Sequence, residues 1–262
     1  MNNEHYKVVS TALEKCYERR IEKVGKIDVF GIIKRKNPYM YRAFGSNDAH
    51  TFVEDILLDA QTSSDETIFG DFFEEVAIGV AKNGRKSTAL GLDLEVWSDD
   101  QREVDLYAIK SGVNVFNSSS RERQRQAFTE AVKRLQGKKV IVTPKVGYGY
   151  GRKNSSEANK DNFVEEAGEV FWTQITDDPS FFLELIELVG VAAEQHKNNF
   201  LSEWQKCVNR QYKKFMDVFG FEDGSIDWEG IVKYSSGAVA PNEIESKMRN
   251  IRKQEKELLK KK

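Results

Sequence analysis

The sequence predicts an α/β protein with a small central mixed β-sheet flanked by helices, and with additional helical segments at both ends. Apolar residues recur near every 3.6 positions in the N-terminal third and again from residue 178, which is the period of amphipathic helices. Residues 92–110 alternate with period two, as β-strands do. A helical stretch and a short apolar strand at 140–143 follow, and this order of strand, helix and strand implies a parallel crossover.

Composition indicates an ordinary globular protein. Apolar residues make up 39% of the 262 residues and charged residues 31%, which is enough apolar surface for a buried core. No stretch approaches the roughly 18 uncharged apolar residues of a membrane helix, and the first 20 residues are too charged for a signal peptide. Two cysteines exclude a disulfide scaffold or a thiolate zinc cluster. We therefore expect a soluble cytoplasmic protein with no membrane partner.

The N-terminal part is predicted to form three helices. The first covers residues 5–33, and Asn37-Pro38 breaks the chain after it. The second runs over about residues 49–61. Ser63, Ser64 and Asp65 then offer capping oxygens to a third helix, at about 66–82.

The period-two stretch predicts a β-hairpin, with a polar turn at 98–102. Serines 118–120 cap the next helix, which ends at Gly137 before the short strand. From residue 178 the chain is helical again, with helices expected at 181–193 and 200–219 and a turn at 223–228.

The hairpin carries two residue types that phosphodiester hydrolysis uses. Asp93 opens one strand and Lys110 closes its partner, so a bulge or twist could bring carboxylate and ammonium together. Carboxylate oxygens bind Mg²⁺, and a nearby ammonium can orient or activate a water for attack on phosphorus. An acidic block before Lys110 and a basic block after it suit a metal site beside a phosphate-binding surface. An Asp and a Lys on neighbouring strands are also a common salt bridge, so spacing alone leaves both interpretations open.

An ordered set of motifs resembles a nuclease family. The stretches GLDLE at 91–95 and AIKSG at 108–112 look like the active-site hairpin of the PD-(D/E)xK nuclease superfamily. More specifically, the chain resembles type II restriction endonucleases of the PmeII type, through motifs in the family's order from about residue 32 to residue 236. These motifs are KNPY at 36–39, SSDETIFG at 63–70, FE at 73–74, IKSG at 109–112, Asn114, NSS at 117–119, GYGYG at 147–151, FW at 171–172 and DGSIDW at 223–228.

The resemblance implies a sheet of the restriction-endonuclease type and a set of site residues. Asp93 would be the central metal ligand, Lys110 the catalytic lysine, the backbone carbonyl of Ile109 a further ligand, and Mg²⁺ the cofactor. The superfamily expects an acid two residues before the lysine, and this sequence has Ala108 there. Glu95, two residues from Asp93 on the same strand face, is the nearest replacement.

Glu74 and Glu75 are further candidates for a carboxylate at the site. Glu74, on the preceding helix, matches the family's own acid there and could act at the site by binding metal through water. Glu75 lies about equally far from the apolar stripe of that helix, so periodicity leaves both open. Asp105 has the opposite parity to Lys110 in a regular strand, which favours a structural role.

Candidate DNA contacts follow the lysine. Ser111 begins a small turn that lets the backbone approach a phosphate, although the turn is also an ordinary strand end. Asn114, Asn117 and Ser118 are candidate phosphate or base contacts, or an ordinary N-cap cluster.

A second candidate region combines flexible backbone, aromatic rings and positive charge. It is the segment GYGYGRK at 147–153, which suits a loop that follows a groove or stacks on a base. Its predicted DNA-binding side chains are Tyr148, Tyr150, Arg152 and Lys153.

The resemblance implies a type II restriction endonuclease that makes Mg²⁺-dependent, sequence-specific double-strand cuts in DNA and leaves 5′-phosphate and 3′-hydroxyl ends. A homodimer and a companion DNA methyltransferase are implied with it. We expect a helical N-terminal segment at 1–62 for dimerisation or DNA contacts, a catalytic α/β core at 63–177 and a helical C-terminal segment at 178–262. The alternatives are a repair or junction-processing nuclease without strict sequence preference, and a catalytically inactive DNA-binding protein, which Ala108 permits.

Overall fold

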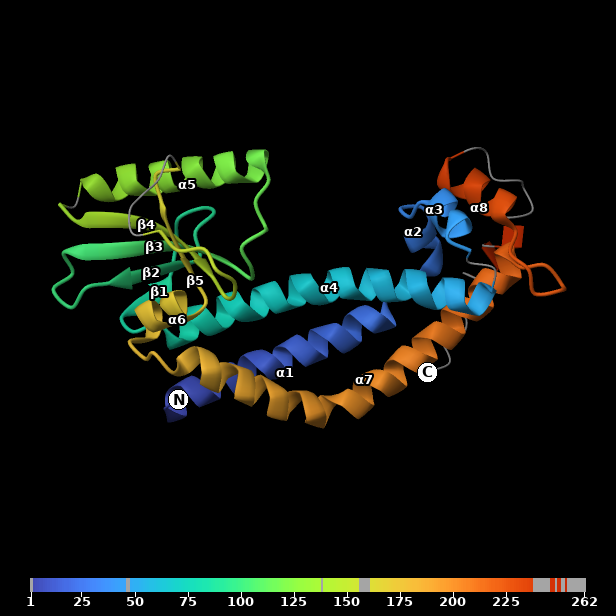
Figure 1. Ribbon diagram of the computed structural model, residues 1–262, viewed down its shortest axis with the longest axis horizontal. Coiled ribbons are helices and arrows are strands. Elements are labelled where there is room, and N and C mark those ends of the chain that lie inside the picture. Colours follow the sequence, from blue (N-terminus) through green and yellow to red (C-terminus); the bar gives the residue numbers. More distant parts are fainter. Residues whose placement is uncertain are drawn as a thin grey trace. The chain divides into compact units, whose positions relative to one another are not determined.

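The computed structural model describes residues 2–45, 48–137, 139–155 and 161–237, together with residues 246, 247, 249, 250 and 253. The chain divides into two compact units. Unit 1 comprises residues 1–18 and 66–196, and unit 2 comprises residues 19–65 and 197–262. The helices are α1 Asn3–Gly25, α2 Val29–Ile33, α3 Pro38–Ala43, α4 Ala49–Val80, α5 Ser118–Gln136, α6 Glu169–Thr176, α7 Phe181–Phe219 and α8 Trp228–Ser235 (Figure 1).

Unit 1 contains a mixed five-stranded sheet in the order β1-β2-β3-β4-β5. Its strands are β1 Gly84–Lys86, β2 Leu94–Trp97, β3 Glu103–Lys110, β4 Ile141–Tyr148 and β5 Val164–Ala167. The first three strands pair antiparallel, and β3, β4 and β5 pair parallel. The predicted mixed sheet, its hairpin and its parallel crossover through α5 are therefore confirmed.

Helices cover both faces of this sheet. Helix α5 lies along one face (Figure 1), where Phe128 and Ala131 pack with Leu106 of β3 and Val146 of β4. The other face packs against part of α4, α6 and the first turns of α7. Its buried side chains come from one cluster, which includes Leu94, Tyr107, Ile109, Phe72, Val76, Phe171 and Phe181. Residue parity along β2 and β3 thus decides which helix layer each side chain meets.

Helix α4 corrects one sequence expectation. The predicted helices at 49–61 and 66–82 are a single helix, because Ser63, Ser64 and Asp65 lie within it and cap nothing. The Asp65 carboxylate instead accepts hydrogen bonds from Arg20 Nε (2.9 Å) and Gln61 Nε2 (2.7 Å). A carboxylate with two side-chain donors is not available to cap a helix end.

Two other helix predictions also need correction. The predicted helices at 181–193 and 200–219 are one helix, α7, and the ring of His196 in the intervening polar stretch stacks on Tyr17 with centroids 4.2 Å apart. The predicted helix at 5–33 is interrupted between α1 and α2. There Gln211 accepts from Val29 N (3.0 Å) and donates to the Ile27 carbonyl (2.8 Å), so the interrupted backbone keeps its hydrogen bonds.

The sheet is also larger than predicted. Strand β4 continues to Tyr148 instead of ending at residue 143, and Pro144 is tolerated because β5 pairs with β4 only from Lys145 onward. Strands β1 and β5 and helix α6 were not predicted. The two strands are three and four residues long, which is too short for an alternating pattern to stand out.

Unit 2 has its own apolar core. Helices α2, α3 and α8 pack there with residues of α4 and α7, and the core includes Phe30, Phe52, Phe215, Phe219 and Ile231. In the part of the chain that the structure describes, none of the helices combines the length and the apolar character that crossing a bilayer requires.

Candidate active site

The hairpin places Asp93 and Lys110 side by side. The Asp93 amide donates to the Tyr107 carbonyl (2.8 Å), and the Asp93 carboxylate accepts from the Ile109 amide (2.7 Å). Lys110 Nζ lies 3.9 Å from Asp93 Oδ2 and donates to the Ile109 carbonyl at 2.9 Å. The two side chains are 20% and 30% exposed, so solvent or a ligand can reach the pair.

Glu74 of α4 belongs to the same electrostatic environment. Burial raises the pKa of the Glu74 carboxyl, and the negative charge of Asp93 raises it further, while the ammonium groups of Lys86 and Lys110 lower it. The neighbouring Glu75 instead forms an ion pair with Lys15 of α1. Of the two acids that periodicity left open, Glu74 is therefore the one whose pKa responds to the charges of Asp93 and Lys110.

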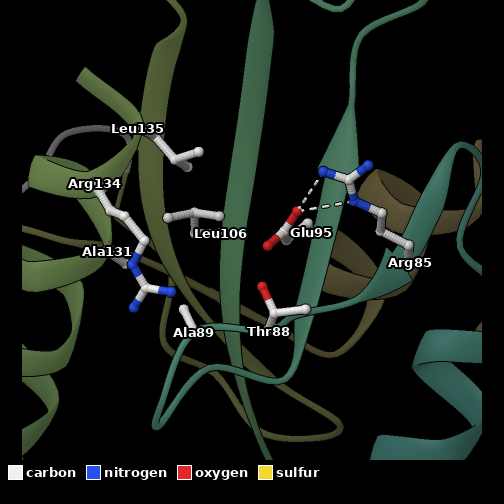
Figure 2. A pocket seen from close by; sticks show the side chains of 8 residues that line it. All are labelled: Arg85, Thr88, Ala89, Glu95, Leu106, Ala131, Arg134 and Leu135. Carbon is white, nitrogen blue, oxygen red and sulfur yellow. Dashed lines mark hydrogen bonds and ion pairs between the residues drawn. The ribbon is translucent and has the colours of Figure 1, made fainter. Parts of the chain in front are cut away.

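Glu95 lies in a different environment. Its buried carboxylate accepts from Arg85 Nε (3.0 Å), Trp97 Nε1 (3.2 Å) and Ser87 Oγ (3.2 Å), and none of these donors belongs to the Asp93–Lys110 pair. Figure 2 shows Glu95 bonded directly to Arg85 among the residues that line a small pocket of about 190 Å³. Arg85 of β1 is the direct sheet partner of Glu95, and on the other side Glu95 pairs with Leu106, four residues before Lys110.

Oxygen ligands at the hairpin fit a magnesium ion. Mg²⁺ is typically held by one or two carboxylates and completes its shell with water. Asp93, Glu74 and the Ile109 carbonyl supply such oxygens, and a divalent cation would relieve the repulsion by which Asp93 raises the pKa of Glu74. Within the described ranges, no group of three or more His, Cys, Asp or Glu side chains could hold a metal ion. The fit thus rests on two carboxylates and a backbone carbonyl.

Lys86 of β1 is a residue that sequence reasoning missed. It pairs with Leu94 in the sheet, and the amide of the next residue, Ser87, donates to the Asp93 carbonyl at 3.0 Å. Its ammonium lowers the pKa of Glu74, so a second cation besides Lys110 acts on that carboxylate. The three-residue strand that carries Lys86 gives no pattern in the sequence, so no signal marked it.

The segments that follow β3 and β4 are joined by backbone hydrogen bonds. Gly149 N donates to the Lys110 carbonyl (2.8 Å), and Tyr150 N donates to the Ser111 carbonyl (3.1 Å). Two of the regions predicted to contact DNA therefore lie together, next to the lysine. The Tyr150 side chain is 60% exposed there.

The remaining predicted DNA-contact residues have unequal access to solvent. Asn114, Ser118 and Arg152 are exposed. Asn117 is exposed too, but its side chain caps α5 by accepting from Ser120 N (2.8 Å) in a capping box. Tyr148 is fully buried.

Glu165 accepts a hydrogen bond from the buried Tyr148 hydroxyl and pairs with cations of the basic block. The Tyr148 hydroxyl donates to Glu165 Oε1 (2.8 Å), and Lys153 Nζ lies 3.1 Å from the same oxygen. Burial and this hydrogen bond both raise the pKa of Tyr148. Arg121 also pairs with Glu165 (3.3 Å), and its Nε donates to Asp161 at 2.7 Å. Two cations of the basic block found in the sequence, Arg121 and Lys153, are thus paired with these acids.

Asp105 occupies a buried network away from the hairpin pair. Its carboxylate lies 2.9 Å from Lys145 Nζ, which also bonds Glu166 (2.8 Å), and the Tyr107 hydroxyl donates to Glu166 at 2.8 Å. Burial lowers the pKa of Lys145, but Glu166 and Asp105 outweigh it and raise the pKa overall. These contacts give Asp105 the structural environment that its parity favoured.

Comparison with known proteins identifies the class. A family model described as "Type II restriction endonuclease EcoO109I" matches residues 3–198, about three quarters of the chain, including every strand of the sheet and the whole hairpin. The class is that of type II restriction endonucleases. The chain belongs to the EcoO109I family within it. No curated protein matches the chain.

Proposed function

We propose that this protein is a Mg²⁺-dependent, sequence-specific endonuclease that cuts both strands of DNA and leaves 5′-phosphate and 3′-hydroxyl ends. We place it in the PD-(D/E)xK superfamily, nearest to the PmeII type, and assign catalysis to Asp93, Lys110 and Glu74. The observation that carries the proposal is the 3.9 Å approach of Lys110 Nζ to a partly exposed Asp93 carboxylate, within a chain of this family.

Each residue has a definite role in this proposal. The Asp93 and Glu74 carboxylates and the Ile109 carbonyl would hold the metal, which when bound neutralises charge on the reacting phosphate. Lys110 Nζ donates hydrogen bonds to the attacking water or to a phosphate oxygen. The attacking water releases one proton to bulk water, which supplies one to the leaving group, and the water oxygen forms a bond to phosphorus as the bond from phosphorus to the 3′ oxygen breaks. That oxygen takes up a proton, and the phosphate stays on the 5′ end.

Glu95 has a structural role in this proposal. Its carboxylate already accepts three hydrogen bonds, and the ion pair with Arg85 leaves it little capacity to bind a cation. Metal binding by Glu95 stays a prediction from the resemblance. Glu74 is the better supported partner of Asp93, because the two carboxylates affect one another electrostatically.

DNA contacts and assembly complete the proposal. The exposed side chains Asn114, Ser118, Tyr150 and Arg152, with Ser111, Asn117 and Lys153 beside them, would contact the duplex near the cut. A homodimer supplies one active site for each strand of a symmetric target. We also propose that residues 63–177 form the catalytic core, that the enzyme acts in the cytoplasm, and that a companion methyltransferase protects the host's sites.

The test is digestion of mixed-sequence plasmid DNA with and without Mg²⁺. Wild type is expected to give discrete bands with Mg²⁺ only, and Lys110→Ala and Asp93→Ala are expected to abolish them. Lys133→Ala, which removes an exposed lysine of α5, is the control and should cut normally. Bands that survive either active-site change would remove the proposed site. A smear would favour a repair or junction-processing nuclease, and tight binding without cleavage in Mg²⁺ or Mn²⁺ would favour an inactive DNA-binding protein.

A further inference from the structure

A surface of unit 2 combines positive charge with exposed aromatic rings. It is formed by the end of α2, the following turn and helix α3, and we call it the α3 surface; its residues are Lys34, Arg35, Tyr39, Met40, Arg42 and Phe44. Tyr39 is 69% exposed and Phe44 is 82% exposed. Single exposed apolar side chains are ordinary, but several on one short segment mark an interaction surface.

The exposed rings do not serve the core of unit 2. Tyr41 anchors α3 from its opposite face, because its hydroxyl donates to Asp59 (2.6 Å) and its ring packs edge-on against Phe52. Asn37 caps the helix by accepting from Tyr39 N (3.1 Å). The helix is therefore held firmly without Tyr39 or Phe44, and both rings face solvent.

The charge of the surface has one sign. Residues 29–47 contain four Lys or Arg residues and no Asp or Glu. Lys36 is paired with Asp59 (3.1 Å), but in the part of the chain that the structure describes neither Lys34 nor Arg35 forms an ion pair with a carboxylate. Lys34 Nζ lies 5.0 Å from the ring centroid of Tyr234, and Arg35 Nε donates to the Gly31 carbonyl. Both side chains keep their charge at the surface.

We propose that the α3 surface is a second DNA-binding surface, which contacts the duplex backbone outside the catalytic unit. Lys34 and Arg35 would each neutralise a phosphate, and Tyr39 and Phe44 would pack against deoxyribose and exposed base edges. A polyanion fits this surface better than a protein partner does, because the six residues that form it include three cations, Lys34, Arg35 and Arg42, and no acid. The inference rests on the proposed function, since it assumes that DNA is the substrate.

The test measures binding of the full chain to a fluorescent DNA duplex in EDTA, over a range of NaCl concentrations. Because each phosphate contact adds about 0.9 to the slope of log affinity against log salt, the double variant Lys34→Ala/Arg35→Ala should lose nearly 2 from that slope. Its affinity at 0.1 M NaCl should fall about tenfold or more. Phe44→Ala should weaken binding about fivefold with the slope unchanged, since it removes no charge.

Two control variants make the result specific. Lys23→Ala/Lys213→Ala removes two exposed lysines from other helices of unit 2 and should leave slope and affinity close to wild type. Lys34→Arg/Arg35→Lys keeps both charges and should bind as wild type does. If the alanine variant lost its helical circular dichroism, this swapped variant and Phe44→Ala would still decide the question.

Several outcomes would overturn the inference. An unchanged salt slope in Lys34→Ala/Arg35→Ala would do so, as would an equal loss in the control pair. A change in sedimenting mass with an unchanged slope would assign the surface to self-association instead. Cleavage by wild type with an unchanged slope in the variant would refute this inference alone, whereas a wild type that neither binds nor cuts DNA would also refute the proposed function.

Discussion

The Asp93 carboxylate contacts both the strand backbone and the lysine. Its Oδ2 accepts the Ile109 amide at 2.7 Å and faces Lys110 Nζ at 3.9 Å, so the group is oriented by the backbone of the strand that also carries the lysine. A side chain fixed in this way loses little freedom when it takes up a ligand. The hairpin therefore preorganises the pair before DNA arrives.

The adjacent acids Glu74 and Glu75 provide a matched test of the second carboxylate. We expect Glu74→Gln to lower the single-turnover cleavage rate by about 10- to 100-fold, because it removes one of the two carboxylates that we propose hold the metal. Glu75→Gln should cut normally, since that side chain pairs with Lys15. Equal rates for Glu74→Gln and wild type at limiting and saturating Mg²⁺ would contradict the assignment.

The Asp161–Arg121 pair should make a pH-dependent contribution to stability. The Arg121 hydrogen bond holds the pKa of Asp161 below its ordinary value, so the contribution is complete above that ordinary value and is lost as the pH falls through the folded-state pKa. We expect Asp161→Asn to lower stability by about 1 kcal/mol or less at pH 7. The difference in Tm between the two proteins should shrink as the pH falls below the ordinary pKa of an aspartate. A difference that is constant with pH would contradict this account.

The role of each acidic side chain was harder to predict from the sequence than the strand on which it lies. Alternation correctly placed Asp93 and Lys110 on neighbouring strands, because period two is a local property. The same alternation predicted Glu95 on the face of Asp93. It could not predict that Arg85, Ser87 and Trp97 bond to the Glu95 carboxylate. The partners of a side chain depend on other strands, and β1 was too short to be recognised.

At the scale of elements, strand β4 and helix α6 pack in close contact at Gly147. A Cβ at this position would lie 2.2 Å from the ring of Phe171, which is fully buried and cannot move away. Gly147→Ala should therefore lower the free energy of unfolding by about 1–3 kcal/mol, measured by urea denaturation. Gly137→Ala is the control, because no described atom lies within 4 Å of its Cβ and its φ of −63° suits alanine. A loss of similar size in both variants would contradict the packing argument.

The ends of helices and strands were predicted well where nearby residues determine them, and poorly where distant residues do. The hairpin turn and the start of α5 are set by nearby polar residues. The turn lies where the sequence placed it, whereas α5 is capped by Asn117 and the serines expected to cap it form its first turn. The Ser63–Asp65 stretch has the same local signal but lies inside α4, because Arg20, distant in sequence, takes up the Asp65 carboxylate. Tertiary contacts of this kind override capping preferences and leave no trace in a short sequence window.

At the scale of the whole molecule, the proposed dimer can be tested on α7. Leu183 and Ile186 of unit 1 are 56% and 63% exposed, and we expect Leu183→Asp/Ile186→Asp to shift the sedimenting mass from dimer to monomer. A monomer cuts one strand at a time, so nicked circles should accumulate from supercoiled plasmid. Leu90→Asp, at an 88% exposed position, should change neither measurement. A double variant that remains dimeric would exclude this face.

The two amide–carbonyl bonds between the 149–150 backbone and the end of β3 have a consequence for fidelity. Tyr150 is the most exposed ring of its loop, and its own amide is tied to Ser111, one residue beyond the lysine. If the loop contacts DNA as we propose, a base pair that displaced it would pull on the Lys110 and Ser111 carbonyls, next to the Ile109 carbonyl that Lys110 Nζ contacts. A mismatched target would then be cut more slowly as well as bound more weakly. The same backbone segment would therefore select the correct sequence both at binding and at cleavage.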